Sequence, residues 1–436
     1  MSLYKTRVEQ GALEGIDMGS YAVYMGIPYA RPPVGDLRFG RPRKAESWSG
    51  VRMAKENPPI AWQIRPEAGS FYEKEFYRGD QSLLSMDEDC LYLNIWTPAK
   101  RAEDRLPVML WIHGGAFNHG FGHEREFDGR AYCERGVILV TIQYRLGVFG
   151  FLSHPWLEEG GNLALQDQAA AISWVYENIG HFGGDNGRIT IAGQSAGGVC
   201  VQAQLCNRAM DGKIHGAIMQ SGGGYGQLAS RMESRAAALE RGAAFLRQCG
   251  ISSREALMGL EAGKLLEYAN KYLYACRIVC GGECIPGSGE AVLYGSGAHA
   301  VPCLLGANKN DIRVTPEMLE NHIPSDLYVG NCGFAEHYGG GNRSFLYFFQ
   351  RDLPGDGAGA FHSAELWYMF GTLGRSWRPF EEADAELSEQ MLDCWSSFVK
   401  LGRPCEALSD WPPYEANGKF IRRFSAGGAF EGRAGK

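Results

Sequence analysis

A serine at the centre of residues 193–197, Gly-Gln-Ser-Ala-Gly, constrains this chain more than any other feature. Residues 188–192 before it have strand character, and the pattern from Ala196 to about Cys206 is helical. Gly193 and Gly197 lie where a side chain would collide with the neighbouring strand or helix in a tight turn. The chain has 59 glycines, so the five-residue pattern alone could arise by chance. The flanking segments instead predict a nucleophile elbow, a sharp strand-to-helix turn that presents the Ser195 hydroxyl.

A second glycine-rich turn follows a buried-strand pattern at residues 106–112. It reads His-Gly-Gly-Ala-Phe at residues 113–117, and backbone N–H groups in such a turn can converge on a negatively charged oxygen. The amides of Gly115 and Ala116, together with that of Ala196 at the helix N-terminus, are therefore the candidate oxyanion hole. A glycine turn after a strand is structural more often than catalytic, but the nearby elbow favours the functional interpretation.

Several longer motifs resemble one family along nearly the whole chain. They are residues 26–35, 88–96, 143–152, 161–168 and 182–185. With the elbow, they make the chain similar to the bacterial-type members of the type-B carboxylesterase/lipase (cholinesterase-like) family of the α/β-hydrolase superfamily. The resemblance implies an α/β-hydrolase fold, with a central, mostly parallel twisted sheet, helices on both faces and a reduced helical cap. It also implies two buried ion pairs, Arg38 with Glu88 and Arg145 with Asp167.

The catalytic residues of an α/β-hydrolase follow the chain order Ser, acid, His. His362, in the run Phe-His-Ser-Ala-Glu after the strand-like residues 345–349, resembles the family's histidine loop. Asp311 lies where the resemblance places the acid, although the family most often has glutamate there, and Glu317 in the next turn is the alternative acid. The predicted triad is Ser195, Asp311 and His362, in which His362 takes the serine proton and Asp311 orients the imidazole.

Other residues around this predicted site are also implied by the resemblance. Ser221 and Glu365 match residues of a buried polar network beside the triad, although Ser221 is equally compatible with an ordinary strand-end serine. Gln194 replaces a frequent glutamate before the nucleophile, which weakens any preference for cationic substrates. Phe117 and His113 are the candidate substrate-pocket residues, and His113 is expected to shape the oxyanion turn.

The order of strand and helix patterns predicts one domain over residues 1–436. Strand runs near 108–112, 137–142 and 188–192 alternate with helical patterns at 163–178 and 196–206, as expected for a parallel sheet. An Ala/Leu/Glu-rich helical insertion at about residues 231–273 is the expected cap. Two further elements are predicted near the end, a helix at 384–402 and a closing strand at 420–424.

Composition restricts the partners. The 43 basic and 50 acidic residues give a net charge of −7 and are interspersed, which disfavours nucleic acid. No apolar run is long enough to span a bilayer, and the first residues lack the apolar core of a signal peptide. The family's upstream partner for Cys90 is missing, so the cysteines are expected to be reduced and the location cytoplasmic. Cys276, Cys280 and Cys284 do not have zinc-site spacing. We expect no metal, no cofactor and no membrane partner, and the oligomeric state is not predicted.

These observations predict a serine carboxylesterase that hydrolyses small to medium, largely apolar carboxylic esters through an acyl-enzyme intermediate. A feruloyl-type esterase for aromatic esters, or a lipase, is the alternative enzyme. A non-catalytic, cholinesterase-like binding module is the alternative from another class, and it is disfavoured because Ser195, Asp311 and His362 are all present.

Overall fold

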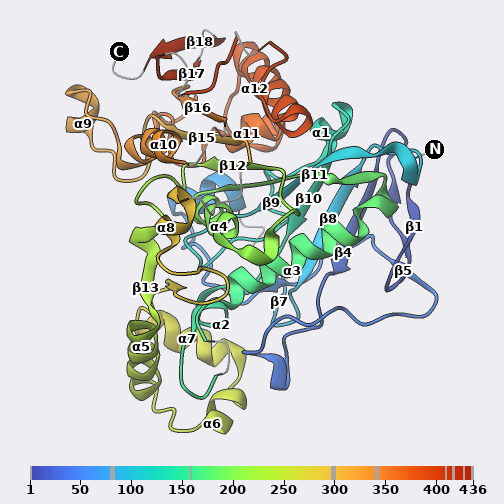
Figure 1. Cartoon of the computed structure of the whole chain (residues 1–436), viewed down its shortest axis with the longest axis vertical. Helices are drawn as coiled ribbons and strands as arrows, with labels where there is room; N and C mark the ends of the chain where they lie inside the picture. Colours follow the sequence, from blue (N-terminus) through green and yellow to red (C-terminus); the bar gives the residue numbers. More distant parts are fainter. Residues whose placement is uncertain are drawn as a thin grey trace.

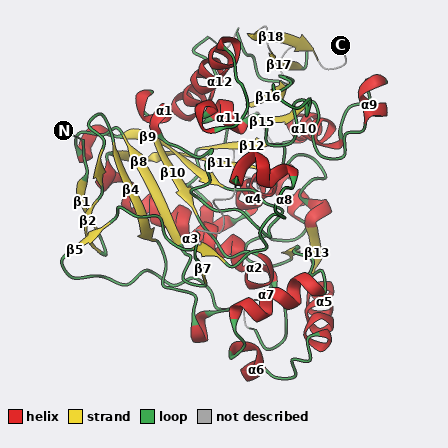
Figure 2. Cartoon of the chain, turned by 180° about the vertical axis from the view of Figure 1, so that it is seen from behind, coloured by secondary structure: helices red, strands yellow, loops and turns green. Residues whose placement is uncertain are grey.

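A twisted sheet of eleven strands forms the centre of the computed structural model (Figures 1 and 2). The structure describes residues 2–78, 84–157, 160–295, 301–338, 343–407, 410–414, 418–425 and 428–433. In spatial order the strands are β18 (Gly428–Arg433), β17 (Phe420–Ser425), β16 (Ser344–Phe349), β15 (Cys303–Asn308), β12 (Gly216–Gln220), β11 (Gly184–Gln194), β9 (Leu106–Ile112), β10 (Ile138–Ile142), β8 (Tyr92–Thr97), β4 (Ala22–Pro28) and β3 (Ile16–Asp17).

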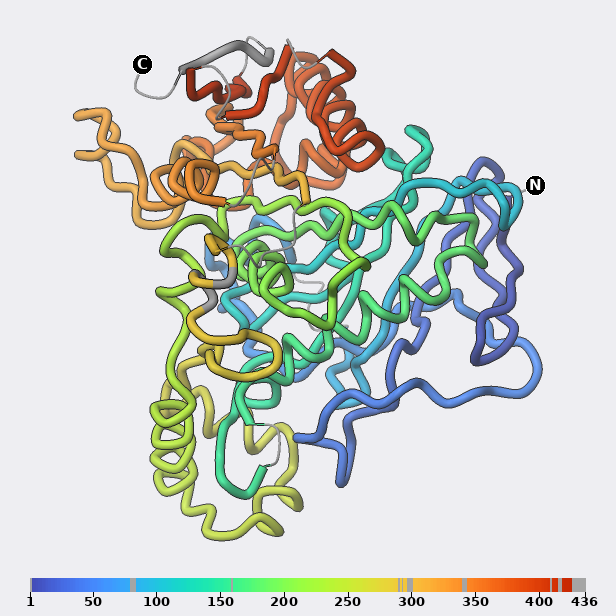
Figure 3. The backbone as a smooth tube through the Cα atoms, viewed as in Figure 1, coloured from blue at the N-terminus to red at the C-terminus, as the bar shows by residue number. Residues whose placement is uncertain are grey.

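The seven strands from β17 to β10 are parallel, and the strands at both edges are antiparallel. Because parallel strands share one direction, the loops after β9, β11, β12, β15 and β16 emerge at the same edge of the sheet. The chain path in Figure 3 shows the N-terminal strands beside one end of this sheet and the C-terminal strands at the other. The fold prediction is therefore confirmed, and the shared edge is where the predicted site residues should meet.

Both faces of the sheet are buried, as the alternation along β9 shows. Val108, Leu110 and Ile112 belong to one hydrophobic core, whereas Met109 and Trp111 belong to a second core. Side chains of successive strand residues point to opposite faces, so a strand buried on both sides reads as a continuous apolar run. This explains why residues 106–112 carry no polar alternation.

Helices cover the two faces. The first core includes residues of α2 (Gly147–Phe151), α3 (Leu163–Asn178) and α4 (Ala196–Cys206); the second includes residues of α1 (Arg130–Glu134), α11 (Leu366–Met369) and α12 (Glu382–Leu401). The described chain also contains α8 (Gly289–Tyr294), α9 (Pro316–Glu320) and α10 (Asp326–His337), and small pairings of β1 (Lys5–Val8), β2 (Gly11–Glu14), β5 (Val51–Met53), β6 (Ile60–Ala61) and β7 (Met86–Asp87).

The insertion expected at 231–273 is helical. It contains α5 (Arg235–Gln248), α6 (Arg254–Met258) and α7 (Ala262–Lys271), and the short strands β13 (Met232–Ser234) and β14 (Ile278–Cys280) pair on either side of it. Figure 1 shows these helices together at one end of the molecule, beside α2. None of the described residues lining the central cavity comes from α5, α6 or α7; Gln227 and Arg231 just ahead of them do line it.

Two predicted boundaries near the C-terminus are wrong. The helix begins at Glu382 rather than Asp384, because Glu381 is the N-cap and Asp384 accepts a hydrogen bond from its backbone N–H at 3.0 Å. Gly402 ends the helix with a left-handed φ of 67°, as predicted. The strand at 420–425 does not close the sheet, since β18 pairs antiparallel beyond it.

Candidate active site

Ser195 lies in the turn between β11 and α4. Its backbone conformation, with φ 57° and ψ −126°, is one that residues other than glycine rarely adopt. A Cβ on Gly193 would lie 2.6 Å from the carbonyl carbon of Gly197, and one on Gly197 would lie 2.1 Å from the carbonyl oxygen of Ile112. The backbone N–H of Ser195 donates to the Gln220 carbonyl at 2.8 Å. Neighbouring backbone therefore leaves no room for side chains at the two glycines, as the sequence pattern predicted.

The turn after β9 brings a second set of backbone amides to the same edge. Gly115 has φ 102°, and a Cβ there would lie 1.9 Å from the carbonyl oxygen of His119. Ala116 and Phe117 also have positive φ, 53° and 64°. Within the described residues, the N–H groups of Gly115 and Ala116 donate to no protein acceptor. Two free amides in a strained, tightly packed turn can donate to an oxygen atom of a ligand.

Asp311 and His362 come from the loops after β15 and β16. The Nδ1 atom of His362 lies 2.5 Å from Oδ1 of Asp311. The Asp311 carboxylate also accepts hydrogen bonds from the Ser221 hydroxyl at 2.6 Å, the Asn308 amide at 2.9 Å and the Ile312 amide at 2.9 Å. Because Nδ1 of His362 faces a carboxyl oxygen that accepts hydrogen bonds, we assign the Nδ1 proton to His362 and leave Nε2 as an acceptor.

The imidazole of His362 is buried, and its Nε2 atom lies 3.3 Å from the Nε2 atom of Gln194. Burial lowers the pKa of His362, but the charges of Asp311 and Glu365 and the hydrogen bond to Asp311 outweigh burial and raise it above the ordinary value. Ser195 lines the same cavity as His362, and its hydroxyl has no hydrogen-bond partner in the part of the chain that the structure describes. The serine hydroxyl and the histidine therefore face the same cavity.

Glu365 forms a buried polar network behind this pair. Its carboxylate accepts from the Asn308 side-chain amide at 2.5 Å and from that of Gln220 at 3.2 Å, and the Trp395 indole donates to Gln220 at 2.9 Å. Burial raises the pKa of Glu365, as does the charge of Asp311, against the lowering effect of the Asn308 hydrogen bond. Asn308 joins the two carboxyl groups, because its backbone N–H donates to Asp311 and its side chain to Glu365.

The other candidates lie elsewhere. Glu317 is exposed on α9 and makes no described contact with His362, so the structure pairs His362 with Asp311. His113 does not line the cavity among the described residues; it is buried under the oxyanion turn and stacks on Tyr144 with the ring centroids 4.4 Å apart. Burial lowers the pKa of His113 to about 3. His113 therefore packs beneath the turn, and His119 lines the cavity where His113 was expected.

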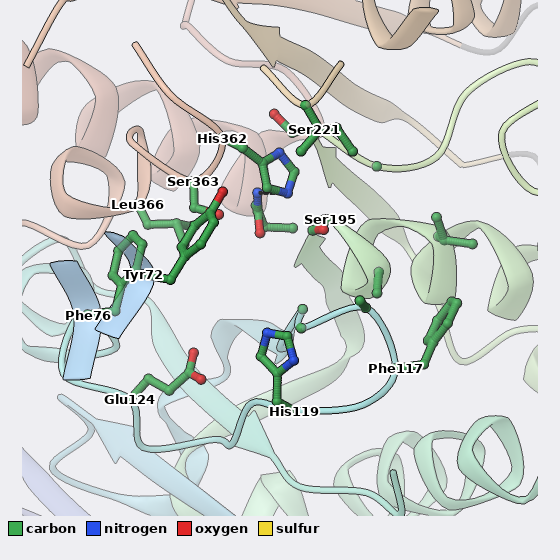
Figure 4. Close-up of a pocket in the computed structure, with 18 of the residues that line it drawn as sticks. Tyr72, Phe76, Phe117, His119, Glu124, Ser195, Ser221, His362, Ser363 and Leu366 are labelled. Carbon is green, nitrogen blue, oxygen red and sulfur yellow. Dashed lines mark hydrogen bonds between the residues drawn. The ribbon is translucent and has the colours of Figure 1, made fainter. Parts of the chain in front are cut away.

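A cavity of about 300 Å³ opens over these residues. Ser195, His362, Ser221, Gln194, the oxyanion turn and Phe117 all line it. Figure 4 shows Ser195 and His362 reaching into it from one side, with Tyr72, Phe76, His119 and Glu124 around the rest. Sequence reasoning missed those four residues and also Glu126. The pattern Glu-x-Glu after the oxyanion turn was the available signal, but it resembles an exposed loop until burial is known.

The two expected ion pairs are confirmed, and both fix loops near the cavity. Arg38 donates to both carboxylate oxygens of Glu88 at 2.6 Å, and Arg145 donates to those of Asp167 at 2.7 and 2.8 Å. Arg38 also donates to the carbonyl groups of Leu257 and Met258 at the end of α6 and of Leu260 just after it, which attaches the helical insertion to the rest of the fold. Buried pairs of this kind fix geometry more than they add stability.

Two possible features are not found in the described residues. No group of three or more His, Cys, Asp or Glu side chains there could hold a metal ion, Cys276, Cys280 and Cys284 included. No helix in that part of the chain is both long and apolar enough to cross a membrane. None of the twelve cysteines, which all lie in the described ranges, forms a disulfide bond.

An elbow serine on a mostly parallel sheet, with a carboxylate and a histidine after the following strands, defines the class as α/β-hydrolases. A sequence model of the Carboxylesterase family matches residues 4–328 and 325–426. The chain belongs to this family, and it is a carboxylic-ester hydrolase.

Similar proteins of known structure and activity agree with this assignment. Human cocaine esterase is 32% identical, over 92% of this chain and 83% of its own length. The para-nitrobenzyl esterase of Bacillus subtilis is 30% identical, over 93% of this chain and 91% of its own length. A solved structure of a thermophilic para-nitrobenzyl esterase superposes with a TM-score of 0.86 at 29% identity, covering 99% of this chain and 98% of that one.

Proposed function

We propose that this protein is a serine esterase that hydrolyses small to medium, largely apolar carboxylic esters through an acyl-enzyme intermediate. The supporting observation is the 2.5 Å contact between His362 and Asp311 beside the free hydroxyl of Ser195, in one cavity. A volume of about 300 Å³ and walls that include Phe76, Phe117 and Phe127 suit an apolar ester of modest size.

In this proposal His362 Nε2 takes the proton from the Ser195 hydroxyl as its oxygen attacks the ester carbonyl carbon. The carbonyl oxygen becomes an oxyanion that accepts hydrogen bonds from the amides of Gly115, Ala116 and Ala196. The intermediate collapses when His362 returns the proton to the leaving alcohol. Water then attacks the acyl-enzyme with His362 again as base, which releases the acid and restores Ser195.

Asp311 supports both half-reactions without touching the substrate. Its hydrogen bond to Nδ1 keeps Nε2 free to accept a proton, and its charge stabilises the imidazolium that forms. Ser221 and the two backbone amides hold the carboxylate in place. Aspartate can replace the family's more frequent glutamate because the loop after β15 brings the shorter side chain within hydrogen-bond distance of His362.

Aromatic esters are a second candidate substrate class. Para-nitrobenzyl esterases are among the similar proteins, and Tyr72, Phe76 and Phe127 offer aromatic surfaces on which a ring of the substrate can pack. We expect the protein to act in the cytoplasm on a small-molecule ester, as predicted from the sequence.

The test is hydrolysis of p-nitrophenyl esters of increasing acyl length, and of a p-nitrobenzyl ester, by wild type and Ser195→Ala. Wild type should hydrolyse the short chains, and the variant should be slower by about a million-fold. If Ser195→Ala retained the wild-type rate, Ser195 would not be the nucleophile. If neither protein hydrolysed any ester, the fold would serve as a binding module.

A further inference from the structure

Two buried glutamates line the catalytic cavity but have no part in the proposed mechanism. Glu124 is 7% exposed and Glu126 is 2% exposed, and both come from the segment between the oxyanion turn and α1. In Figure 4 the carboxyl group of Glu124 points into the cavity, on the side opposite His362. Buried carboxyl groups are costly unless they have partners, so this pair needs an explanation.

The partners within the protein are incomplete. The Tyr77 hydroxyl donates to Glu124 at 2.7 Å, the Phe121 backbone also donates to Glu124, and the two carboxyl groups share a hydrogen bond. The Oε2 atom of Glu126, however, is fully buried and has no hydrogen-bond partner in the described chain. No lysine or arginine in the described ranges forms an ion pair with either carboxyl group. Glu75 nearby differs: Arg378 lies 3.0 Å from both of its oxygens, and the indoles of Trp367 and Trp377 donate to it.

None of the described neighbours supplies a positive charge to the pair. Burial raises the pKa of Glu124 to about 7, and burial together with the charge of Glu124 raises the pKa of Glu126 well above its ordinary value. Burial lowers the pKa of His119, and lowers that of His123 to about 4, so both imidazoles are neutral at physiological pH. Without a ligand, the pair therefore keeps protons to avoid two buried charges.

We propose that Glu124 and Glu126 form a subsite for a primary ammonium group on the ester substrate, across the cavity from Ser195. An ammonium group carries three N–H donors and one positive charge. It can donate to the unpartnered Glu126 Oε2 and to Glu124 at once, and its charge compensates a buried carboxylate. The aromatic rings of Phe76, Trp111 and Phe127 line the same cavity and suit the alkyl chain that carries the amine.

This subsite extends the proposed function and rests on it, since it assigns amino esters as a substrate class of the same cavity. It also places negative charge farther from Ser195 than the glutamate that Gln194 replaces. A hydroxyl group is the competing ligand, because it could donate to Glu126 and accept from the Trp111 indole N–H, which lacks a partner in the described chain. A quaternary ammonium has no N–H and cannot donate a hydrogen bond to Glu126.

The first experiment compares substrates that differ only at the chain end. They are p-nitrophenyl 6-aminohexanoate, 6-hydroxyhexanoate and heptanoate, and for the alcohol side 6-aminohexyl and heptyl butyrate. On one of the two sides, wild type should prefer the amino ester to its methyl isostere by at least about ten-fold in kcat/KM, because a charge-assisted hydrogen bond is gained. Equal or lower kcat/KM for both amino esters overturns the proposal, and so does a preference for the hydroxy ester.

Two variants assign the preference to the pair. Glu126→Gln and Glu124→Gln should each lower the ratio of amino to methyl ester toward one. Glu134→Gln removes the same charge from an exposed site on α1, where Glu134 pairs with Arg130, and should keep the wild-type ratio. If Glu134→Gln reduced the ratio as much as Glu126→Gln, the preference would be long-range electrostatics and the subsite would be rejected.

Binding gives a readout that does not depend on catalysis or on the stability of a glutamate variant. Calorimetry with the Ser195→Ala protein should show hexylammonium binding at least about ten-fold more tightly than 1-hexanol or hexyltrimethylammonium. Repeating it in buffers of different ionisation enthalpy should show proton release near pH 7, as the carboxyl pair ionises. Failure to hydrolyse p-nitrophenyl butyrate would reject the esterase proposal alone, whereas the absence of selective hexylammonium binding would reject the subsite.

Discussion

Two pairs of buried carboxyl groups lie near the cavity and have different surroundings: Glu124 and Glu126 line it, whereas Asp311 and Glu365 lie behind His362. Asp311 and Glu365 receive hydrogen bonds from side chains and amides of the loops after β12, β15 and β16. Glu124 and Glu126 follow β9; the Tyr77 hydroxyl donates to Glu124, the two carboxyl groups share a hydrogen bond, and Oε2 of Glu126 has no partner in the described chain. Both pairs are equally removed from water, so burial alone does not distinguish their functions.

The difference lies in the donors. A carboxyl group that already has donors from the protein is held in a fixed position before any substrate arrives, and it can orient a histidine. A carboxyl group without donors keeps its proton and costs free energy until a ligand completes it. The first arrangement suits catalysis, and the second suits recognition.

The largest expected effect comes from changing Asp311, whose carboxyl group already has hydrogen-bond donors from the protein. Asp311→Asn keeps the shape of the side chain but presents an amide to His362, which favours the tautomer that cannot accept the serine proton. We expect kcat to fall by about 10⁴-fold. The measurement is the kcat for p-nitrophenyl butyrate, with Glu317→Gln on the exposed face of α9 as control. Full activity in Asp311→Asn together with loss in Glu317→Gln would show that Glu317 is the acid.

For the Glu124–Glu126 pair, we expect a substitution of Glu124 to change the stability of the protein. Burial raises the pKa of Glu124 from 4.5 to about 7, so the folded state binds more protons than the unfolded state between these values. The free energy of unfolding therefore falls as pH rises through this window. Glu124→Gln removes the titration and should make the protein more stable at pH 8, by up to about 3 kcal/mol. Urea unfolding at pH 5 and pH 8 measures this, and an equal effect at both pH values would contradict it.

The same comparison shows what the sequence could predict. The elbow, the oxyanion turn and the strand order depend on local patterns, and the positions of Ser195, Asp311 and His362 come from motifs that keep their order along the chain. The environment of Glu124 and Glu126 depends on packing between Tyr77, Trp111 and Phe127, which lie up to 50 residues apart (127 − 77). No local pattern reports such packing, so two buried glutamates look like an exposed loop, and His113 looks like a pocket residue.

A smaller effect is expected from removing one of the hydrogen-bond donors to Asp311. Ser221→Ala deletes the hydroxyl that donates to Asp311 at 2.6 Å, while Asn308 and Ile312 still donate to the carboxylate. We expect kcat to fall about ten-fold with little change in KM, because a hydrogen bond to a charged group is lost. Ser344→Ala is the matched control, since Ser344 is buried and its hydroxyl has no partner in the described chain. Equal losses in both variants would indicate a packing effect.

The smallest effect is expected from adding a negative charge beside His362. The Gln194 side-chain nitrogen lies 3.3 Å from His362 Nε2, so the carboxylate in Gln194→Glu would stabilise the imidazolium and raise the pKa of His362 further. Because His362 must be neutral to act as base, the acid limb of the profile of kcat/KM against pH should move upward by about one unit. Activity at pH 9 should change little. Gln390→Glu adds the same charge on the exposed face of α12 and should leave the limb in place. If the acid limb of the profile of kcat/KM against pH did not move in Gln194→Glu, a charge at residue 194 would not affect the pKa of His362. The donors to Asp311 alone would then set the basicity of the histidine.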